Sequence, residues 1–196
     1  MKKGLLIAIG VLVILVALIG WGMSAYNGMV TAEEQVDAQW GNVENVYQRR
    51  ADLIPNLVST VKGYATHESS TLENVVAARA KATSVTVDVN NLNEATLKKY
   101  QAAQGELSQA LGRLLAITEN YPDLKANQNF LELQAQLEGT ENRIAVERNR
   151  YNESAKLFNV TIRRFPAVLI AGIGGFDKKP YFEAEAGASS APKVEF

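Results

Sequence analysis

The chain contains no cysteine and a single histidine, His67, among its 196 residues. Without cysteine there can be no disulfide, no thiolate metal site and no lipidated cysteine. Nucleophilic catalysis needs a base beside an activated serine or cysteine, and metal chemistry needs clustered histidine, cysteine or carboxylate groups. His67 lies near an expected helix junction, where a solvated or capping role is expected, and the adjacent Glu33 and Glu34 carry no sign of a cleft. The sequence therefore predicts no enzyme, no cofactor, no metal and no small-molecule substrate.

An excess of positive charge is also lacking, because 20 basic residues face 21 acidic residues. Phosphate contacts dominate nucleic-acid affinity and require a basic surface, so no nucleic-acid partner is predicted. Gly172, Gly174 and Gly175 superficially resemble a nucleotide-binding loop. That fingerprint requires a strand before it, a helix after it and an acidic residue downstream, and none of these is predicted here.

A run of about 22 residues without a charge, Gly4 to Ala25, is the strongest signal that is present. As a helix it is long enough to cross about 30 Å of hydrocarbon. Trp21 and Tyr26 lie where interfacial aromatic residues are expected. The alternative is a cleaved signal peptide, but the run exceeds the usual apolar region of about 7–15 residues and lacks a good cleavage site. We predict an uncleaved transmembrane anchor over residues 1–25.

The charges on either side of this span predict its orientation. Lys2 and Lys3 precede the span. Glu33, Glu34 and Asp37 follow it, and there is no basic residue between the span and Arg49. The positive-inside rule then retains the N-terminus in the cytoplasm. We expect a single-pass protein of a bacterial inner membrane, with everything after Tyr26 outside the cytoplasm.

Most of the remaining chain predicts helix, because apolar residues return every three or four positions over stretches with little glycine or proline. The expected helices run from the anchor to about residue 64, with a kink but no loop at Pro55, and then over residues 68–83, 94–120 and 122–164. Apolar residues of the last helix recur at seven-residue intervals: Phe130, Leu137, Ile144, Tyr151 and Phe158. The fold class is all-α, with one N-terminal transmembrane helix followed by an elongated up-down-up-down four-helix bundle over residues 26–166.

Charged residues interrupt these apolar stripes at Arg50, Glu141 and Arg148. In one interpretation Glu141 and Arg148 lie at the rim of the stripe and extend to water. In the other, Arg50 pairs with Glu141 in an interhelical polar network that also includes Asn56 and Asn152. Such a network adds little net stability but can determine the register between helices.

An apolar run of about ten residues, Ala167 to Phe176, follows the last helix and is too short to span a bilayer. An up-down-up-down bundle returns its fourth helix to the membrane, so residues 167–182 are expected to be membrane-proximal, with Phe165 and Phe176 at the interface. The run then contacts lipid or packs at the foot of the anchor. The alternative is a buried segment that covers the end of the bundle. Residues 183–196 are rich in Ala, Ser and Glu, which predicts a disordered tail.

Four segments resemble the LemA family of bacterial membrane proteins: residues 47–68, 121–130, 137–152 and 181–183. The resemblance covers about residues 20–185. It implies one N-terminal membrane helix, a four-helix bundle and no established enzymatic activity. Family descriptions favour an external N-terminus and a cytoplasmic bundle, whereas the lysines here favour the opposite orientation. A relative takes part in making magnetosome membranes, which suggests membrane organisation by analogy.

Two functions are consistent with these observations. In the first, the bundle is a scaffold or assembly factor that self-associates or holds other membrane proteins. In the second, the segment 167–176 senses or shapes the lipid bilayer. Cross-linking in native membranes separates the two, because only a scaffold requires discrete protein neighbours.

Overall fold

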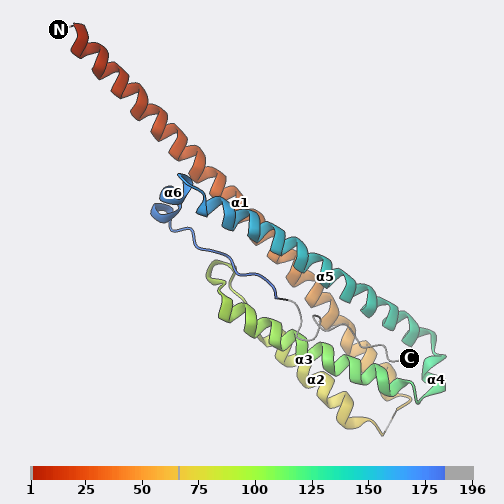
Figure 1. Ribbon diagram of the computed structural model, residues 1–196. Helices are drawn as coiled ribbons and strands as arrows, with labels where there is room; N and C mark the ends of the chain where they lie inside the picture. The colour runs from red at the N-terminus through yellow and green to blue at the C-terminus, as the bar shows by residue number, and fades with distance from the viewer. Residues whose placement is uncertain (1, 66, 184–196) are drawn as a thin grey trace, which may run out of the picture. The chain divides into compact units, whose positions relative to one another are not determined.

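The computed structural model describes residues 2–65 and 67–183, and all its regular secondary structure in those ranges is helical. The helices are α1 (Lys2–Lys62), α2 (Ser69–Ser84), the 3₁₀ helix η1 (Val89–Asn91), α3 (Glu94–Thr118), α4 (Pro122–Lys125), α5 (Gln128–Arg163) and α6 (Ala167–Gly174) (Figure 1). The predicted all-α fold class is confirmed. The predicted disordered tail lies outside the described residues from residue 184 onward.

The chain divides into two compact units, which we call the anchor unit and the bundle unit. The anchor unit comprises residues 1–39 and 153–179, and the bundle unit comprises residues 40–152 and 180–196. The predicted segment bounds of 1–25, 26–166, 167–182 and 183–196 do not correspond to this division and stay predictions. Each unit is described separately below.

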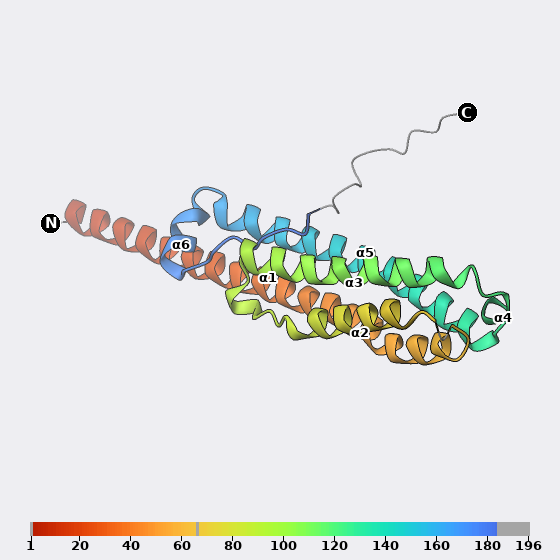
Figure 2. The same ribbon diagram turned by 90° about the horizontal axis from the view of Figure 1, so that it is seen from below.

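Four helical segments form the bundle unit: the second part of α1, then α2, α3 and the first part of α5 (Figure 2). Their apolar stripes meet in one core, because residues three and four apart lie on one face of a helix. The core residues are Ile54, Leu57, Val61, Ala65, Leu72, Val75, Ala82, Leu107, Leu111, Leu114, Leu124, Phe130 and Leu137. This arrangement is only roughly consistent with the four-helix bundle expected over residues 26–166. Helix α1 continues through Pro55 without a loop.

The expected fourth helix over residues 122–164 was wrong at its start. The structure has a short helix α4 and then a separate helix α5 that begins at Gln128. Asn127 causes the break, because its side-chain Oδ1 accepts a hydrogen bond from the backbone N–H of Phe130 at 3.0 Å. An asparagine that caps the third amide of a helix gives that helix a new N-terminus.

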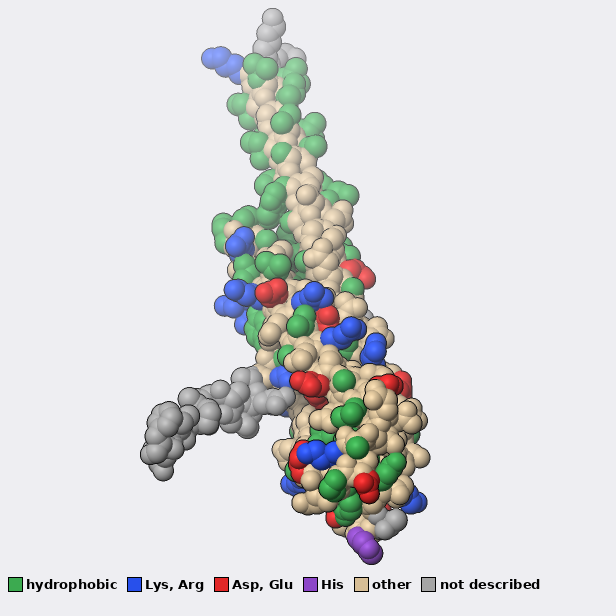
Figure 3. Space-filling view, turned by 90° about the vertical axis from the view of Figure 1, so that its right-hand side faces the viewer, with side chains coloured by type: hydrophobic (Ala, Val, Ile, Leu, Met, Phe, Trp, Pro, Cys, Tyr) green, Lys and Arg blue, Asp and Glu red, His purple; other side chains and the backbone are tan. Residues whose placement is uncertain are grey.

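The N-terminal part of α1 in the anchor unit exposes its apolar side chains. From Leu5 to Ile19 the large apolar side chains are between 49% and 69% exposed. Figure 3 shows hydrophobic side chains covering this stretch on the face in view. Among the described residues, α1 is long and apolar enough to cross a membrane, and a signal sequence would pass the same test. This helix is therefore a candidate membrane span.

Helix α6 folds back from α5 within the same anchor unit and contacts α1. The two helices α5 and α6 meet at a bend of 103°. Ile170 Cδ1 lies 3.6 Å from the position that a Cβ would take on Gly22. At the other end of α6, a Cβ on Gly174 would lie 2.8 Å from the Phe176 ring and 3.1 Å from Tyr26. Gly174 therefore permits the close packing of α6 against the foot of the apolar helix.

Candidate functional site

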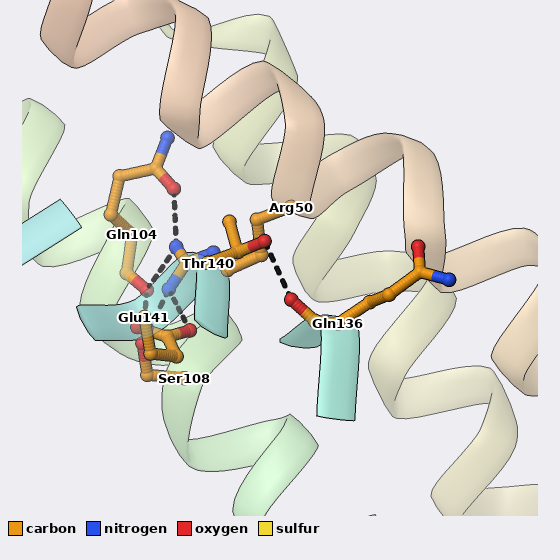
Figure 4. Close-up of polar contacts among 6 residues, drawn as sticks. All are labelled: Arg50, Gln104, Ser108, Gln136, Thr140 and Glu141. Atoms are coloured by element: carbon orange, nitrogen blue, oxygen red, sulfur yellow. Dashed lines mark hydrogen bonds and ion pairs between the residues drawn. The ribbon is translucent and has the colours of Figure 1, made fainter. Parts of the chain in front are cut away.

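A buried arginine, Arg50 on α1, is the centre of the main polar cluster in the bundle unit (Figure 4). Its side chain is only 1% exposed. One terminal nitrogen, Nη1, lies 2.8 Å from Glu141 Oε1 on α5 and donates a hydrogen bond to Ser108 Oγ on α3, also at 2.8 Å. The other, Nη2, donates to Gln104 Oε1 at 2.6 Å and to the Gln104 carbonyl at 3.2 Å. One side chain thus joins three helices.

The structure brings Arg50 and Glu141 together but places the other members of the expected network elsewhere. Asn56 is exposed on α1, and including it in this cluster was wrong. Asn56 lies six residues after Arg50, which places the two side chains about 120° apart around the axis of α1. Arg148 and Asn152 share a helix face with Glu141 but lie two and three turns further along α5.

Arg148 and Asn152 instead hold an extended segment near the C-terminus, Pro180–Glu183, which we call the strap. Asn152 forms two hydrogen bonds with the backbone of Phe182, donating from Nδ2 to the carbonyl at 3.0 Å and accepting from the amide at 2.8 Å. Arg148 Nη2 donates to the Glu183 carbonyl at 2.7 Å. Gln101 donates to the same carbonyl at 3.2 Å, and the Tyr151 hydroxyl donates to the Pro180 carbonyl at 3.1 Å. The strap is thus held mainly through its main chain.

The one strap side chain that is buried, Phe182, enters an aromatic cluster. Its ring stacks on Trp40 with ring centroids 5.8 Å apart and an interplanar angle of 11°, and meets Tyr151 edge-on at 5.3 Å. The Arg148 guanidinium lies over the Phe182 ring, with its central carbon 5.2 Å from the ring centroid. Trp40 also contacts Tyr100 at 5.4 Å, and Tyr47 contacts Tyr100 edge-on at 5.4 Å. Burial is the main cause that raises the pKa of Tyr100 above its ordinary value.

Sequence analysis missed the strap site, which we define as Trp40, Gln101, Arg148, Tyr151 and Asn152. One signal could have indicated part of it: an aromatic residue followed by asparagine occurs at Tyr151-Asn152 and recurs seven residues later at Phe158-Asn159. In the anchor unit Asn159 forms the same two-bond pairing with the backbone of Lys179, at 2.8 and 2.9 Å. Asn152 and Asn159, seven residues apart on α5, therefore each bind the backbone of a residue that follows α6 in sequence.

A second buried cation, Lys179, lies in the anchor unit. Its Nζ is 2.8 Å from Glu33 Oε1 and 3.7 Å from Asp37 Oδ1, and its side chain is 9% exposed. Burial raises the pKa of Asp37 above its ordinary value, although the charge of Lys179 opposes the shift.

The four residues expected at a membrane interface all belong to the anchor unit. Trp21 and Tyr26 are 40% and 43% exposed, and Phe165 is 83% exposed. Phe176 is partly buried, because its ring contacts Tyr26 at a centroid distance of 5.3 Å and Phe158 at 6.3 Å. Phe176 thus packs against the end of the apolar stretch of α1. Packing against the anchor is one of the two placements expected for the apolar run Ala167–Phe176.

A cleft of the bundle unit with a volume of about 690 Å³ lies beside Arg50. Its charged lining residues are Arg50, Lys98, Arg148, Glu106, Glu141 and Glu183. Three positive and three negative side chains cancel, so the cleft presents no net charge to select an ionic ligand. Within residues 2–65 and 67–183 no three histidine or carboxylate side chains group in a way that could hold a metal ion.

Comparison with known proteins gives consistent matches over most of the chain. Residues 39–196 match the family model described as the LemA family. The Magnetosome protein MamQ of Magnetospirillum gryphiswaldense is 32% identical over 195 residues, which cover 91% of this chain and 71% of that protein. Magnetosome protein MamQ 2 of Paramagnetospirillum magneticum is 29% identical, covering 86% of this chain and 68% of its own length. Protein LemA of Metamycoplasma hominis is 24% identical, covering 71% and 60%.

Proposed function

This chain belongs to the LemA family, and from that membership and its structure we propose that it is a non-enzymatic, single-pass protein of a bacterial inner membrane. In this proposal the N-terminal helix and α6 hold the protein at the bilayer. The bundle unit acts as a scaffold or assembly factor that binds further copies or other membrane proteins. The orientation that we propose places the bundle outside the cytoplasm.

The distribution of exposed apolar surface is the observation that carries this proposal. Most of the large exposed apolar side chains among the described residues belong to the anchor unit, on the N-terminal part of α1, the end of α5, α6 and the link between these two helices. Those of the bundle unit are few: Tyr64, Val76, Leu131, Val146 and Tyr181. Apolar surface gathered in one unit favours insertion into lipid, and a mostly polar second unit favours a role in water at the membrane surface.

Lysine-reactive cross-linking of the full-length, tagged protein in native membranes tests the scaffold function. A scaffold yields discrete cross-linked species of defined mass, whereas a protein that acts on lipid alone yields none above the monomer. The matched control replaces residues 4–25 with an unrelated apolar span of equal length. The cross-linked species should persist in this control, because the proposal assigns them to the bundle. Their absence from the unmodified protein would exclude the scaffold function.

A second candidate function is supported by the surface of α6. Leu169 and Ile173 on this helix are 59% and 86% exposed. The basic residues Arg163, Arg164 and Lys178 flank α6 in sequence and are also exposed. Apolar side chains bordered by basic residues are typical of helices that lie in the interface of anionic bilayers. In this alternative α6 senses or shapes the membrane.

A fluorophore sensitive to polarity, attached at Ile173→Cys, tests the lipid contact without competing labels, because the chain has no other cysteine. In vesicles with anionic phospholipid the emission should indicate an apolar environment. The same label at Val146→Cys, an exposed position of the bundle unit, should indicate water and is the matched control. A label at residue 173 that also reports water would contradict the lipid function. Replacing Arg163, Arg164 and Lys178 by glutamine should weaken the preference for anionic vesicles.

A further inference from the structure

The end of α5 and the helix α6 are together apolar enough to form a membrane segment, and the chain bends by 103° between them. Residues 160–178 include this bend and α6, and we call them the α6 segment. A bent apolar segment either crosses the bilayer as a broken span or enters and leaves it through one face as a re-entrant segment. The positions of its two ends decide between these alternatives.

The two ends of the α6 segment are bonded to each other. Asn159, directly before the segment, donates from Nδ2 to the carbonyl of Lys179, directly after it, at 2.8 Å. The Lys179 amide donates to Asn159 Oδ1 at 2.9 Å, and Lys179 Nζ forms an ion pair with Glu33 on α1 at 2.8 Å. A crossing would separate the two ends by about 30 Å of hydrocarbon. The chain therefore enters and leaves through the same face, beside Glu33.

The contacts of the chain after the bend show how far it reaches along the apolar part of α1. Three contacts follow in order: Ile170 with Gly22, Phe176 with Tyr26, and Lys179 with Glu33. Among these contacts the one at Gly22 lies furthest into the uncharged run, about 5 Å along the helix from the end of that run at Ala25. The α6 segment therefore lies near the face at which the candidate span leaves the bilayer.

The side chains that the α6 segment exposes suit this depth. Its most exposed large apolar side chains are Phe165, Leu169 and Ile173. Its exposed charged side chains are Arg163, Arg164, Asp177 and Lys178, of which three are basic. A guanidinium binds phosphate with two parallel hydrogen bonds, and long basic side chains extend from an apolar level to the lipid headgroups. Acyl chains and headgroup phosphates are thus the matching partner groups.

We propose that the α6 segment is a re-entrant surface that binds the phospholipids of one leaflet, the leaflet through which α1 leaves the bilayer on its way to Glu33. This inference rests on the proposed attachment of α1 and α6 to the bilayer and specifies its topology and depth. Phe165 and Ile173 contact the acyl chains close to the headgroups, and Arg163 and Arg164 contact the phosphates. Insertion into one leaflet expands that leaflet alone, which couples this surface to membrane curvature.

Labelling from one side of the membrane tests the topology. Leu157→Cys before the segment and Asp177→Cys within its last turn of chain are made separately in the full-length protein, since both residues are exposed and the chain has no other cysteine. A third variant carries a cysteine inserted after Met1, on the other side of the candidate span. A membrane-impermeant maleimide added to sealed vesicles should label Leu157→Cys and Asp177→Cys from the same side, and the inserted cysteine from the opposite side.

Quenching by brominated phospholipids tests the depth. A fluorophore at Ile173→Cys should be quenched at least about twofold more by bromine close to the headgroup than by bromine at the end of the acyl chains. The same fluorophore at Ile14→Cys, an exposed position in the middle of the uncharged run, is the matched control and should show the reverse order. Circular dichroism of each variant verifies that the helices are intact.

Substitution of both arginines tests the phosphate contact. Arg163→Gln with Arg164→Gln should lower the quenching at residue 173 by headgroup-proximal bromine about twofold, because the bonds that hold the segment among the headgroups are lost. Lys156→Gln, an exposed basic position of α5 before the segment, is the matched control and should leave the quenching unchanged. Quenching that is insensitive to the arginine substitutions would refute the phosphate contact.

The possible failures are distinguishable. Labelling of Leu157→Cys and Asp177→Cys from opposite sides would show a crossing and overturn the re-entrant topology, while the lipid contact of α6 would stand. Quenching of residue 173 in the same order as residue 14 would overturn the depth. A label at residue 173 that neither bromine quenches would place the segment in water and overturn this inference together with the lipid function. The scaffold function has its own test in lysine cross-linking.

Discussion

Arg50 illustrates at the residue scale how a charge can be accommodated inside a helical bundle. Its guanidinium is buried, but it has partners on α3 and α5, and only its Nε lacks a hydrogen-bond partner. Glu141 differs, because 42% of its side chain is exposed and water can solvate its carboxylate. Arg50 therefore depends on Glu141 to compensate its buried charge, whereas water can solvate Glu141 without Arg50.

We predict that Glu141→Ala lowers the free energy of unfolding by about 3 kcal/mol, because it leaves the Arg50 cation buried without its counterion. Adding Arg50→Met to Glu141→Ala should restore part of that loss, because the uncompensated charge is removed and the methionine fills similar volume. Chemical denaturation of the full-length protein in detergent micelles measures both changes.

Asn56→Ala is the control for this pair and should change stability by less than about 0.5 kcal/mol, since Asn56 is exposed and lies away from Arg50. Arg50→Met alone completes the comparison. If Glu141→Ala with Arg50→Met lost as much stability as the sum of Glu141→Ala and Arg50→Met measured separately, Arg50 and Glu141 would not be coupled.

Tyr100 gives a prediction for alkaline pH. Burial raises its pKa above the ordinary value of 10.0. The unfolded chain then loses the phenolic proton at a lower pH than the folded chain, so ionisation favours unfolding. The stabilising contribution of the protonated Tyr100 is complete below pH 10 and is lost as the pH rises above 10. Tyr100→Phe should therefore show a shallower decline of Tm than the natural chain between pH 9 and 11, measured by circular dichroism. Parallel declines would show that Tyr100 ionises equally in both states.

The helices themselves were largely predictable at the scale of the elements. The bounds of α2 and α3 agree with the expected ranges of 68–83 and 94–120 to within about two residues. Both helices carry regular apolar stripes, and α3 begins at a capping box formed by Asn93 and Thr96. The break before α5 was not predicted, because the apolar spacing continues across it and only the side-chain bond of Asn127 marks the new N-terminus.

Asn127→Ala should lower the free energy of unfolding by about 1 kcal/mol, the usual cost of losing a helix cap. Asn127 Nδ2 also donates to the Tyr64 hydroxyl at 2.9 Å, so part of the loss belongs to that bond. Tyr64→Phe separates the two contributions, because it removes the hydroxyl and leaves the cap intact. Denaturation of both variants provides the measurement. A Tyr64→Phe variant as unstable as Asn127→Ala would show that the cap contributes nothing.

At the scale of the whole molecule, we predict the direction in which the candidate span inserts from the charges close to it. Lys2 and Lys3 lie on its short side, and the basic residues Arg163, Arg164 and Lys178 occur more than a hundred residues after it. The positive-inside rule counts residues within about 15–20 positions of the span, so these distant basic residues do not set the orientation.

We therefore predict that alkaline phosphatase fused after Phe196 is active and that a fluorescent protein active only in the cytoplasm, fused at the same position, is dark. Replacing Lys2 and Lys3 by glutamine should reduce the phosphatase activity, because it removes the charge bias that holds the N-terminus inside. A bright fluorescent fusion with an inactive phosphatase fusion would establish the opposite orientation.

The sequence by itself determined the helices, the apolar candidate span and the likeness to the LemA family, because each rests on residues that are close together in the chain. Helical periodicity arises from contacts three and four residues apart, and a span arises from one continuous apolar run. The tertiary structure alone decided that α6 packs on α1 and that the strap lies beside Trp40 and Asn152. The strap has no periodic pattern of its own, and its conformation comes from side chains that lie far from it in sequence.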